Sequence, residues 1–328
     1  MSARAWALFA AVSVVWGTPY LFIKIAVEEM SPGFVAWSRL ALAAAVLLPV
    51  AIRLGAFRGL RMRPLLAFAA VEMAIPWPLI GFGEQRVSSS LTAILIATVP
   101  LFVALLALRF DHSERPTRAR FAGMLVGLLG VVVLVGIDIG GRSGELLGAG
   151  AVLLAAFGYA VGPMLVKRHF ADVDPLGPIT AAITIATLML LPFGVADMPT
   201  ETPSAEAIAS IVALGLICSA LAFLLFFRLI AEAGPSRATV ITYVNPIVAL
   251  ALGVAILGEE VTTGAVAGLL LILAGSWLST DGRVPPGLAA LAGRLPRRSS
   301  GRAAPGPARA VATPARLRPV ERPSRPRP

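Results

Sequence analysis

Ten apolar runs dominate this chain, and they restrict its fold more than any other feature. Each run is roughly 17–22 residues long, enough for a helix to cross the ~30 Å hydrocarbon core of a bilayer. Backbone polar groups cannot stay unpaired in lipid, so each run is predicted to be a helix. The short connections leave no room for a soluble domain. The runs lie near residues 5–26, 34–53, 65–83, 88–108, 119–136, 146–166, 176–194, 207–227, 236–256 and 264–280.

The composition of the 328 residues supports the same class. Hydrophobic residues make up 57% of the chain and charged residues 14%, and the mean hydropathy is +0.84. An ordinary globular domain has about 25% charged residues. A soluble fold of this length could not cover its surface with so few polar groups. We therefore expect an all-α, multi-pass protein of the inner cell membrane with ten transmembrane helices.

The formal net charge of +10 comes from the C-terminal tail, residues 281–328. The tail holds eleven arginines against two acids, so the first 280 residues carry only +1. This distribution argues against a nucleic-acid-binding protein. The tail also holds 10 of the 26 prolines, and a segment of this composition cannot bury enough apolar surface to order itself. It is predicted to be disordered, either as a weak tether to anionic lipid or as a solvated tail without a role.

Basic residues alternate between the connections, which predicts the orientation of the chain. Every second connection is basic, whereas the intervening connections 28–33 and 196–206 are acidic or nearly neutral. Basic connections stay in the cytoplasm, and the basic tail falls on the same side. Both termini are therefore predicted to be cytoplasmic. The basic connections carry Arg53, Arg58, Arg61, Arg63, Arg109, Arg115, Arg118, Arg120, Lys167, Arg168, Arg228 and Arg237.

The two halves of the chain are similar to each other. The similarity divides the chain into two repeats of five helices, residues 5–136 and 146–280. Because five is odd, the second repeat enters the membrane with the opposite orientation. Inverted repeats are typical of secondary transporters, which bind their substrate near mid-membrane between the halves. The matching positions are Lys24 with Lys167, Pro32 with Pro175, Pro49 with Pro192, and segment 99–108 with segment 245–254.

Six segments of the chain form a recognisable pattern by their order and spacing. They are WGTPYLFIK (16–24), SPGFVAWSRLALAA (31–44), SSSLTAILIATVPLFVALLA (88–107), SERPTRARFAGMLVGLLGV (113–131), GPSRATVITYVNPIVALALGVAILGEEVT (234–262) and AGLLLILAG (267–275). This pattern resembles the drug/metabolite transporter superfamily, specifically its EamA-type ten-helix proteins, over about residues 5–280, everything but the tail. The resemblance implies export or exchange of small metabolites, often amino-acid-like or drug-like. One segment departs from the family pattern, because FDHSE (110–114) replaces the usual Gly-Glu of the first repeat.

The sequence also restricts the chemistry of the protein. It contains no ATP-binding loop, so we expect alternating access driven by a proton gradient or by substrate exchange. Cys218 is the only cysteine, and His112 and His169 lie in polar connections, so no metal or cofactor is expected. The expected partners are a small-molecule substrate and membrane lipid. The alternatives are a membrane-embedded enzyme, which would need clustered acids or histidines at a membrane face, and a non-transporting receptor or scaffold.

The segment WGTPYLFIK contains residues that are costly in a helix surrounded by lipid. Trp16, Tyr20 and Lys24 are spaced by four residues and would share one helix face. They are candidates to bind the substrate. Lys24 is one of only two lysines, and its alternative role is to reach the headgroups from a helix end. For Lys167, in a basic loop, the headgroup role is expected.

Pro19 lies in the middle of the same segment and cannot donate a backbone hydrogen bond. The carbonyl of Val15 would therefore be freed. With the hydroxyl of Thr18, it would offer polar groups to a substrate in a central cavity. The alternative is a kink that packs against a neighbouring helix.

Two charged residues lie inside the second and third runs. Arg39 is about five residues, or ~8 Å, into its run. It is predicted either to bind an anionic group such as a carboxylate or to form a fold-stabilising ion pair. Glu72 is predicted either to carry a proton or to pair with Arg39 or Lys24. Trp77, between two prolines of the third run, is a candidate to line the cavity.

Polar residues of the ninth run complete the candidate site. Tyr243 and Asn245 either line the cavity or, in the case of the asparagine, join two helices through a hydrogen bond. Glu114 and Glu259 are predicted to be loop or helix-cap groups. Small residues predict close-packing surfaces between the halves or between the protomers of a homodimer. These residues are Gly123, Gly127, Gly130, Gly268 and Gly275.

Overall fold

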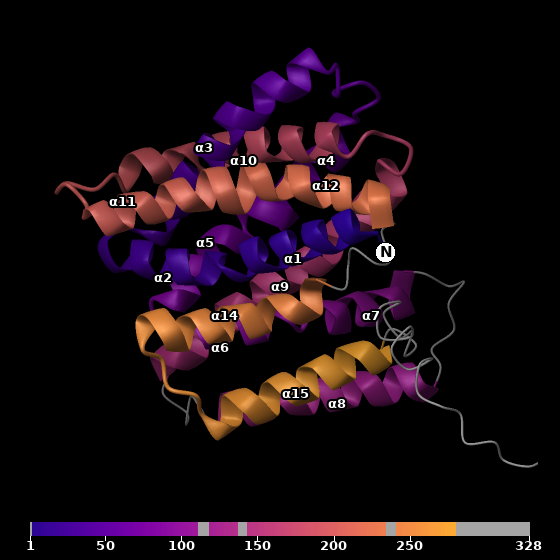
Figure 1. Cartoon of the computed structure of the whole chain (residues 1–328), viewed down its shortest axis with the longest axis vertical. Coiled ribbons are helices and arrows are strands. Elements are labelled where there is room, and N and C mark those ends of the chain that lie inside the picture. The colour runs from indigo at the N-terminus through magenta and orange to yellow at the C-terminus, as the bar shows by residue number, and fades with distance from the viewer. Residues whose placement is uncertain (1, 111–117, 137–142, 234–240, 280–328) are drawn as a thin grey trace, which may run out of the picture.

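The fold is a bundle of helices, taken from a computed structural model that describes residues 2–110, 118–136, 143–233 and 241–279. Within these ranges every regular element is a helix, and the helices lie side by side (Figure 1). The elements η1 and η3 are π-helical. The elements are α1 (Ala3–Gly17), α2 (Pro19–Glu29), α3 (Pro32–Arg53), α4 (Met62–Ala69), η1 (Ala70–Ala74), α5 (Pro76–Glu84), α6 (Ser89–Ile96), α7 (Val99–Phe110), α8 (Arg118–Leu134), α9 (Ser143–His169), α10 (Leu176–Ala196), α11 (Ala205–Val212), η3 (Ala213–Leu221), α12 (Ala222–Ala233), α14 (Ile241–Leu257) and α15 (Thr263–Ser279).

Many of these elements join end to end into runs long enough to cross a membrane. The described residues contain seven such apolar runs of 19–29 residues and three shorter apolar helices. The prediction of helix over the apolar runs is confirmed for the described residues. Residues 236–240 of the ninth run and residue 280 of the tenth lie outside them. The seven runs are Ala3–Glu29, Pro32–Arg53, Met62–Glu84, Ser89–Ala107, Ser143–His169, Leu176–Ala196 and Ala205–Ala233, and the shorter helices are Phe121–Leu134, Ile241–Leu257 and Thr263–Leu278.

The interruption of the first run is confined to one residue, Thr18. Helix α1 ends at Gly17 and α2 begins at Pro19, a position that suits proline. Thr18 nevertheless keeps a helical backbone, with φ −84° and ψ −20°. Its N–H donates to the carbonyl of Val14 at 3.2 Å. The two helices therefore follow one another with a local break between them.

The π-helical segments η1 and η3 occupy matching positions in the two halves. Segment η1 joins α4 to α5, and η3 joins α11 to α12. The repeat offset of 143 residues places the first residue of η1, Ala70, on the first residue of η3, Ala213. Such segments are rare and often lie at functional sites. Here η1 carries Glu72, and η3 carries Cys218 and Ser219.

Helices of the two halves pack in corresponding pairs. Helix α1 packs on α12 and α14, and α9 packs on α5 and α7. Helix α3 lies against α10, and α8 lies against α15 (Figure 1). Each of the last two pairs joins a helix of the first half to its counterpart in the second. The halves are therefore interleaved rather than set apart.

Glycines let α8 and α15 approach until their backbones touch. A Cβ atom at Gly275 would collide with main-chain atoms of Gly127 and Gly123. A Cβ atom at Gly130 would lie 2.8 Å from the backbone nitrogen of Ile272. The predicted close-packing surface is confirmed, and it lies between the two halves of one chain.

The largest apolar cluster lies where α3, α4, η1, α5 and α10 meet. Leu40, Leu47, Met73 and Ile183 are fully buried in it. Trp77 of α5 belongs to the same cluster, and the partly buried Tyr159 of α9 packs against it. The candidate site lies beside this cluster, because Arg39 precedes Leu40 on α3 and its guanidinium lies over the ring of Trp77.

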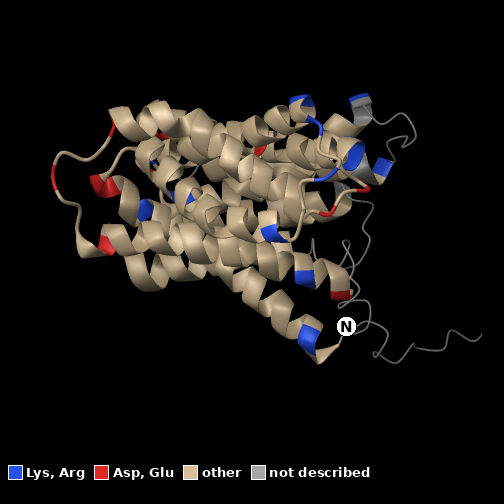
Figure 2. Cartoon of the chain, turned by 90° about the horizontal axis from the view of Figure 1, so that it is seen from above, with Lys and Arg blue, Asp and Glu red and all other residues tan. Residues whose placement is uncertain are grey.

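Charged side chains gather at the two ends of the bundle (Figure 2). Acidic residues lie at one end, on the turns α2–α3, α10–α11 and α14–α15. Most of the described lysines and arginines lie toward the other end, with a few acids among them. His112, Glu114 and the tail 281–328 lie outside the described residues, so the predictions for them stay predictions.

Candidate functional site

Arg39 of α3 is the central charged group of the candidate site. It is only 8% exposed. Its Nε donates to Oγ of Ser219 at 2.9 Å, and its guanidinium carbon lies 3.8 Å from the centre of the Trp77 ring. Ser219 in turn donates to the carbonyl of Leu214 at 2.8 Å. The second, third and eighth apolar runs therefore meet at this guanidinium.

No carboxylate pairs with Arg39 in the part of the chain that the structure describes. The salt bridge found there joins Arg4 and Glu232 at 2.8 Å, elsewhere in the bundle. The hydroxyl of Ser219 and the ring face of Trp77 each attract a cation, but neither neutralises it. The predicted fold-stabilising ion pair is thus absent. What the arrangement offers is a buried cation ready for an anionic group.

No sequence pattern indicates a role for Ser219, because a single serine in an apolar run is usually a packing residue. Its position in η3, where the structure has a π-helical segment, is the feature that brings its hydroxyl to Arg39. Within η3 the hydroxyl of Ser219 also donates to the carbonyl of Leu214, five residues earlier. A π-helical segment is not readable from sequence pattern.

The carbonyl of Val15 is not free. The Oγ1 atom of Thr18 donates to it at 2.8 Å and also lies 3.3 Å from Sγ of Cys218. The prediction that Pro19 opens this carbonyl to a substrate is therefore wrong. The threonine beside the proline supplies the hydrogen that the proline lacks. Through Cys218, Thr18 lies next to the segment that holds Arg39.

Trp16 and Tyr20 have different neighbours. Trp16 packs on α12, with its ring 5.6 Å from that of Phe223 and 4.7 Å from that of Phe226. Tyr20, in contrast, is partly buried on α2. Tyr159 of α9 packs against the apolar cluster that contains Trp77. Trp16 thus joins an aromatic cluster, whereas Tyr159 lies beside the residues around Arg39.

Lys24 points into the protein. Its ammonium donates to the main-chain carbonyl of Glu84 at 2.6 Å and to that of Val87 at 3.4 Å. These carbonyls lie at and just beyond the end of α5, where a cation is favoured. The side chain does not reach for headgroups. Lys167, its repeat counterpart, is exposed in the last turn of α9.

Glu84 is not among the site residues predicted from the sequence, because the third apolar run is predicted to end at residue 83. The structure shows it fully buried at the end of α5. Neither of its carboxylate oxygens has a hydrogen-bond partner in the described residues. An acid directly after an apolar run is the signal that could have found it.

Glu72 lies in η1 without the predicted ion pair. Its Oε2 atom is buried and has no hydrogen-bond partner in the described residues, and it forms no salt bridge there with Arg39 or Lys24. Its carboxylate fills the space beside Gly162 of α9, where a Cβ atom would collide with it. The prediction that Glu72 pairs with Arg39 or Lys24 is therefore wrong.

Asn245 links the ninth run to the first. With its amide nitrogen turned toward them, it donates to the carbonyl of Ile241 at 2.9 Å and to that of Ser13 at 3.2 Å. Tyr243 is partly buried two residues earlier on α14. The contacts of Asn245 join α14 to α1, and they fit the helix-packing alternative.

Glu259 caps the start of α6 from the far end of the sequence. Its two carboxylate oxygens accept from the backbone N–H groups of Ser89 at 2.7 Å and Ser90 at 3.0 Å. The hydroxyl of Ser90 donates to it as well. The prediction of a helix-cap role is confirmed for Glu259. Lys24 at the end of α5 and Glu259 at the start of α6 thus hold the turn between these helices from both sides.

Replacing Glu259 by alanine is expected to lower the free energy of unfolding by about 1 to 2 kcal/mol, because the first N–H groups of α6 lose their acceptor. The melting temperature of the purified protein measures the change. Glu260→Ala is the matched control, since Glu260 is exposed. Equal losses in the two variants would contradict the capping role.

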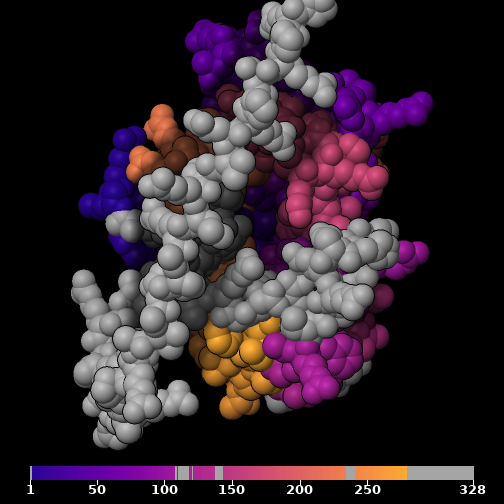
Figure 3. All heavy atoms as spheres, turned by 90° about the vertical axis from the view of Figure 1, so that its right-hand side faces the viewer, coloured from indigo at the N-terminus to yellow at the C-terminus, as the bar shows by residue number. Residues whose placement is uncertain are grey.

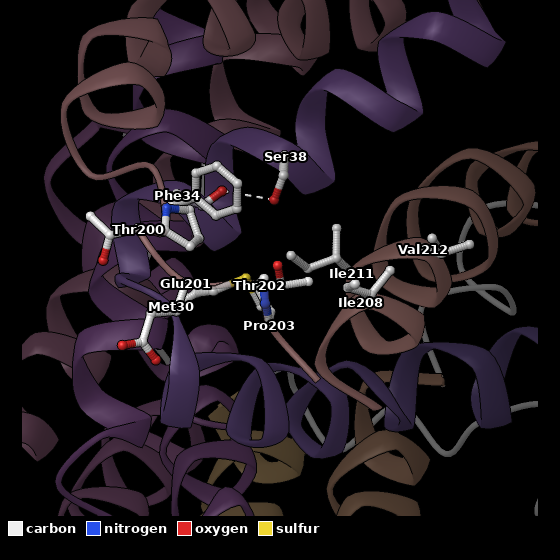
Figure 4. Close-up of a pocket in the computed structure, with 11 residues that line it drawn as sticks. Met30, Phe34, Ser38, Thr200, Glu201, Thr202, Pro203, Ile208, Ile211 and Val212 are labelled. Atoms are coloured by element: carbon white, nitrogen blue, oxygen red, sulfur yellow. Dashed lines mark hydrogen bonds between the residues drawn. The ribbon is translucent and has the colours of Figure 1, made fainter. Parts of the chain in front are cut away.

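The two ends of the bundle differ in shape. At the arginine-rich end the surface is hollowed beside the end of α9, in pink (Figure 3). At the acidic end a pocket of about 420 Å³ lies between α3, α11 and the loop 199–203 (Figure 4). Ser38 lines this pocket, but its hydroxyl donates to the carbonyl of Phe34 at 2.7 Å.

Hydrogen bonds tie the two halves together around that pocket. Ser31 donates to Asp197 at 3.2 Å, and the backbone N–H of Ser204 donates to Glu29 at 2.7 Å. These hydrogen bonds join the turn after α2 to the loop before α11. The two halves are thus hydrogen-bonded to each other at the acidic end, whereas the surface at the opposite end is hollowed.

Comparison with known proteins agrees with this picture. The model of the "EamA-like transporter family" matches residues 4–136 and again residues 146–280. The chain is 31% identical over 265 residues to the "Uncharacterized inner membrane transporter YedA" of Escherichia coli, covering 78% of this chain and 83% of that protein. A solved crystal structure shares the fold, with a TM-score of 0.61 at 19% identity, over 86% of this chain and 98% of the other.

Two further relatives carry more specific names. The "Probable terminal-alkyne amino-acid exporter" of Streptantibioticus cattleyicolor is 31% identical over 85% of this chain and 93% of its own length. The "Probable amino-acid metabolite efflux pump" of Salmonella typhimurium is 25% identical over 86% and 96%. The double family match covers most of the chain, and the long apolar helices fit it. The chain therefore belongs to the EamA-like transporter family and is a multi-pass protein of the inner membrane.

Proposed function

We propose that this protein is a secondary transporter that exports or exchanges small carboxylate-bearing metabolites by alternating access. The observation that carries the proposal is Arg39, a buried guanidinium without a carboxylate partner in the described residues. A cation inside a membrane bundle is costly unless an anion joins it. A substrate carboxylate would supply that anion and would bind through charge-assisted hydrogen bonds.

The surroundings of Arg39 favour such a ligand. Ser219 holds only the Nε edge of the guanidinium, at 2.9 Å. Trp77 covers one face. The two terminal nitrogens are therefore left for a planar, two-oxygen acceptor, which is the geometry that arginine recognises best. Tyr159, which packs against the cluster that contains Trp77, is a candidate to contribute its hydroxyl group to the same ligand, and Tyr20 is a second candidate.

The architecture supports the proposed transport mode. We infer ten spans in two inverted five-helix repeats, residues 5–136 and 146–280, with both termini cytoplasmic. The corresponding helix pairs and the matching π-helical segments support the repeat. The arginine-rich end supports the orientation. In inverted repeats the substrate site lies at mid-membrane between the halves, and Arg39 joins a helix of each half through Ser219.

The substrate class draws on the relatives as well. Two of them are named for amino acids or their metabolites. An α-amino acid carries the carboxylate that Arg39 would bind. The other residues that we propose as candidates for contact with such a substrate are Trp16, Thr18, Tyr20, Lys24, Trp77, Tyr243 and Asn245.

Proton coupling is the proposed driving force, and Glu72 is its first candidate. Its buried Oε2 atom has no partner in the described residues, and an acid inside a membrane bundle is a natural proton carrier. Glu72 also sits in the π-helical segment η1, where a helix can rearrange locally.

Counterflow in proteoliposomes tests the proposed function. Vesicles are preloaded with a mixture of unlabelled amino acids, and entry of a labelled mixture is followed. Entry above that into protein-free vesicles is expected. The corresponding amines, which lack the carboxylate, should compete poorly compared with the amino acids. Equal competition by the amines would overturn the carboxylate site. Absence of any entry with amino acids or other carboxylates would overturn the transporter assignment.

A further inference from the structure

The second buried acid, Glu84, lies in an unusual place for a carboxylate. It is the last residue of α5, it is 0% exposed, and both of its side-chain oxygens lack a hydrogen-bond partner in the described residues. The helix α9 covers this end of α5 with apolar atoms, since Val152 packs directly against Gly83. An ionised carboxylate without hydrogen-bond donors is strongly unfavourable in such surroundings.

A cation is present beside Glu84, but it binds the main-chain carbonyl of this residue and not its carboxylate. The ammonium of Lys24 donates to the main-chain carbonyl of Glu84 at 2.6 Å, and its second contact is the carbonyl of Val87. The carboxylate of the same glutamate is left without a donor. No Lys24–Glu84 salt bridge is present among the described residues. Movement of the ammonium from the carbonyl to the carboxylate would form that ion pair.

Other charged and titratable groups act on Glu84 from the elements around it. Lys24 and Tyr20 face it from α2, Arg39 from α3, and Glu259 from the turn before α15. Glu259 is occupied by the N–H groups at the start of α6, so it accepts rather than donates. Arg39 binds Ser219 and Trp77. Lys24 is therefore the group that can exchange partners.

We propose that Glu84 is a proton-binding site of this transporter, and that Lys24 takes the place of the proton when the proton leaves. The proposal rests on the proposed function for its role in transport and adds a residue and an ion to it. In one state the neutral acid Glu84 is buried and Lys24 caps α5. In the other state the proton has passed to water, and the ammonium of Lys24 pairs with the carboxylate.

The exchange conserves charge and links the proton to a helix. One proton leaves the Oε atom of Glu84 for the aqueous phase, and the ammonium already present neutralises the anion that remains. Lys24 lies on α2, the helix that begins directly after the break at Thr18. A change of partner by its side chain would therefore change the contacts of α2, the second part of the first run. A substrate amine or a metal ion fits this site less well, because the lysine is its resident cation.

Infrared difference spectroscopy of the full-length protein in lipid vesicles tests the proposal with protons as the probe. The carbonyl stretch of a protonated carboxyl is expected at neutral pH in the wild-type protein. Glu84→Gln should lose that component, and Glu260→Gln, a change at an exposed glutamate, should keep it. In Lys24→Met the cation that replaces the proton is gone, so the band should persist when the buffer is made alkaline. A band unchanged in Glu84→Gln, or lost only in Glu72→Gln, would overturn the proposal.

Transport gives the second measurement. In vesicles with a proton gradient of one pH unit, coupling of one proton to each substrate supports about tenfold accumulation of labelled amino acids. Glu84→Gln should reduce this ratio to about one while counterflow continues, and Glu260→Gln should retain both activities. Full accumulation by Glu84→Gln would contradict proton coupling at this site. If the wild-type protein moves no carboxylate, the proposed function fails, and the infrared band still decides whether Glu84 holds a proton.

Discussion

Replacing Arg39 by glutamine is expected to weaken carboxylate transport roughly 10- to 100-fold. A hydrogen bond to a charged group contributes about 1.5–3 kcal/mol, and each 1.4 kcal/mol is a tenfold change in affinity. The guanidinium would be lost from a site where Ser219 and Trp77 hold it in place. The half-saturating concentration of labelled amino acids in counterflow measures the effect.

The fold should survive this substitution. Removing a buried charge that has no ionic partner removes its desolvation cost as well, so stability is expected to stay or rise. Arg39→Lys keeps the charge but not the planar fork, and we expect it to fall between the wild type and the glutamine variant. Arg53→Gln is the matched control, because Arg53 is exposed in the last turn of the same helix. Similar losses in the Arg53 and Arg39 variants would contradict a substrate role.

Replacing Gly275 by leucine is expected to prevent α8 and α15 from packing and to destabilise the protein by about 3 kcal/mol or more. Even one added carbon would collide with the main chain of Gly127 and Gly123. Backbone atoms cannot rotate away as a side chain can, and overpacking commonly costs about 1–3 kcal/mol even where side chains yield. The melting temperature and the yield of folded protein in detergent measure the loss.

Gly150→Leu is the control for that substitution. Gly150 lies in α9, and no atom lies within 4 Å of the position a Cβ would take. The larger side chain should be tolerated there, because it points into open space that lipid would fill. If Gly150→Leu and Gly275→Leu lower the melting temperature equally, close backbone contact is not what fixes the α8–α15 pair.

The candidate site was only partly predictable. Arg39 can be identified from the sequence, because a charged residue at that depth in an apolar run is rare and is usually functional. The residues that contact it cannot be identified in the same way. Ser219 is an ordinary residue in an apolar run until a π-helical segment turns it toward the guanidinium. Glu84 falls at the boundary of a run, where sequence pattern is least certain.

Local chemistry misled the prediction at two positions. The proline rule correctly places a break at Thr18, but it does not say that the threonine hydroxyl would satisfy the carbonyl of Val15. Spacing and charge suggest that Glu72 pairs with a cation, yet the structure leaves its Oε2 atom beside Gly162 of another helix. In both cases the contact depends on the three-dimensional arrangement of side chains and helices, which residue spacing in the sequence does not specify.

The sequence by itself determined the helical, membrane-spanning class of this protein, because lipid admits few alternatives to an apolar helix. It also indicated which glycines could serve as packing surfaces and that Glu259 would be a loop or helix-cap group. The tertiary structure alone decided the partners. It brought Glu259 to a helix start 170 residues away in the chain, Ser219 to Arg39, and Lys24 to the end of α5. Such contacts depend on how helices cross and rotate, and an apolar run carries little information about either.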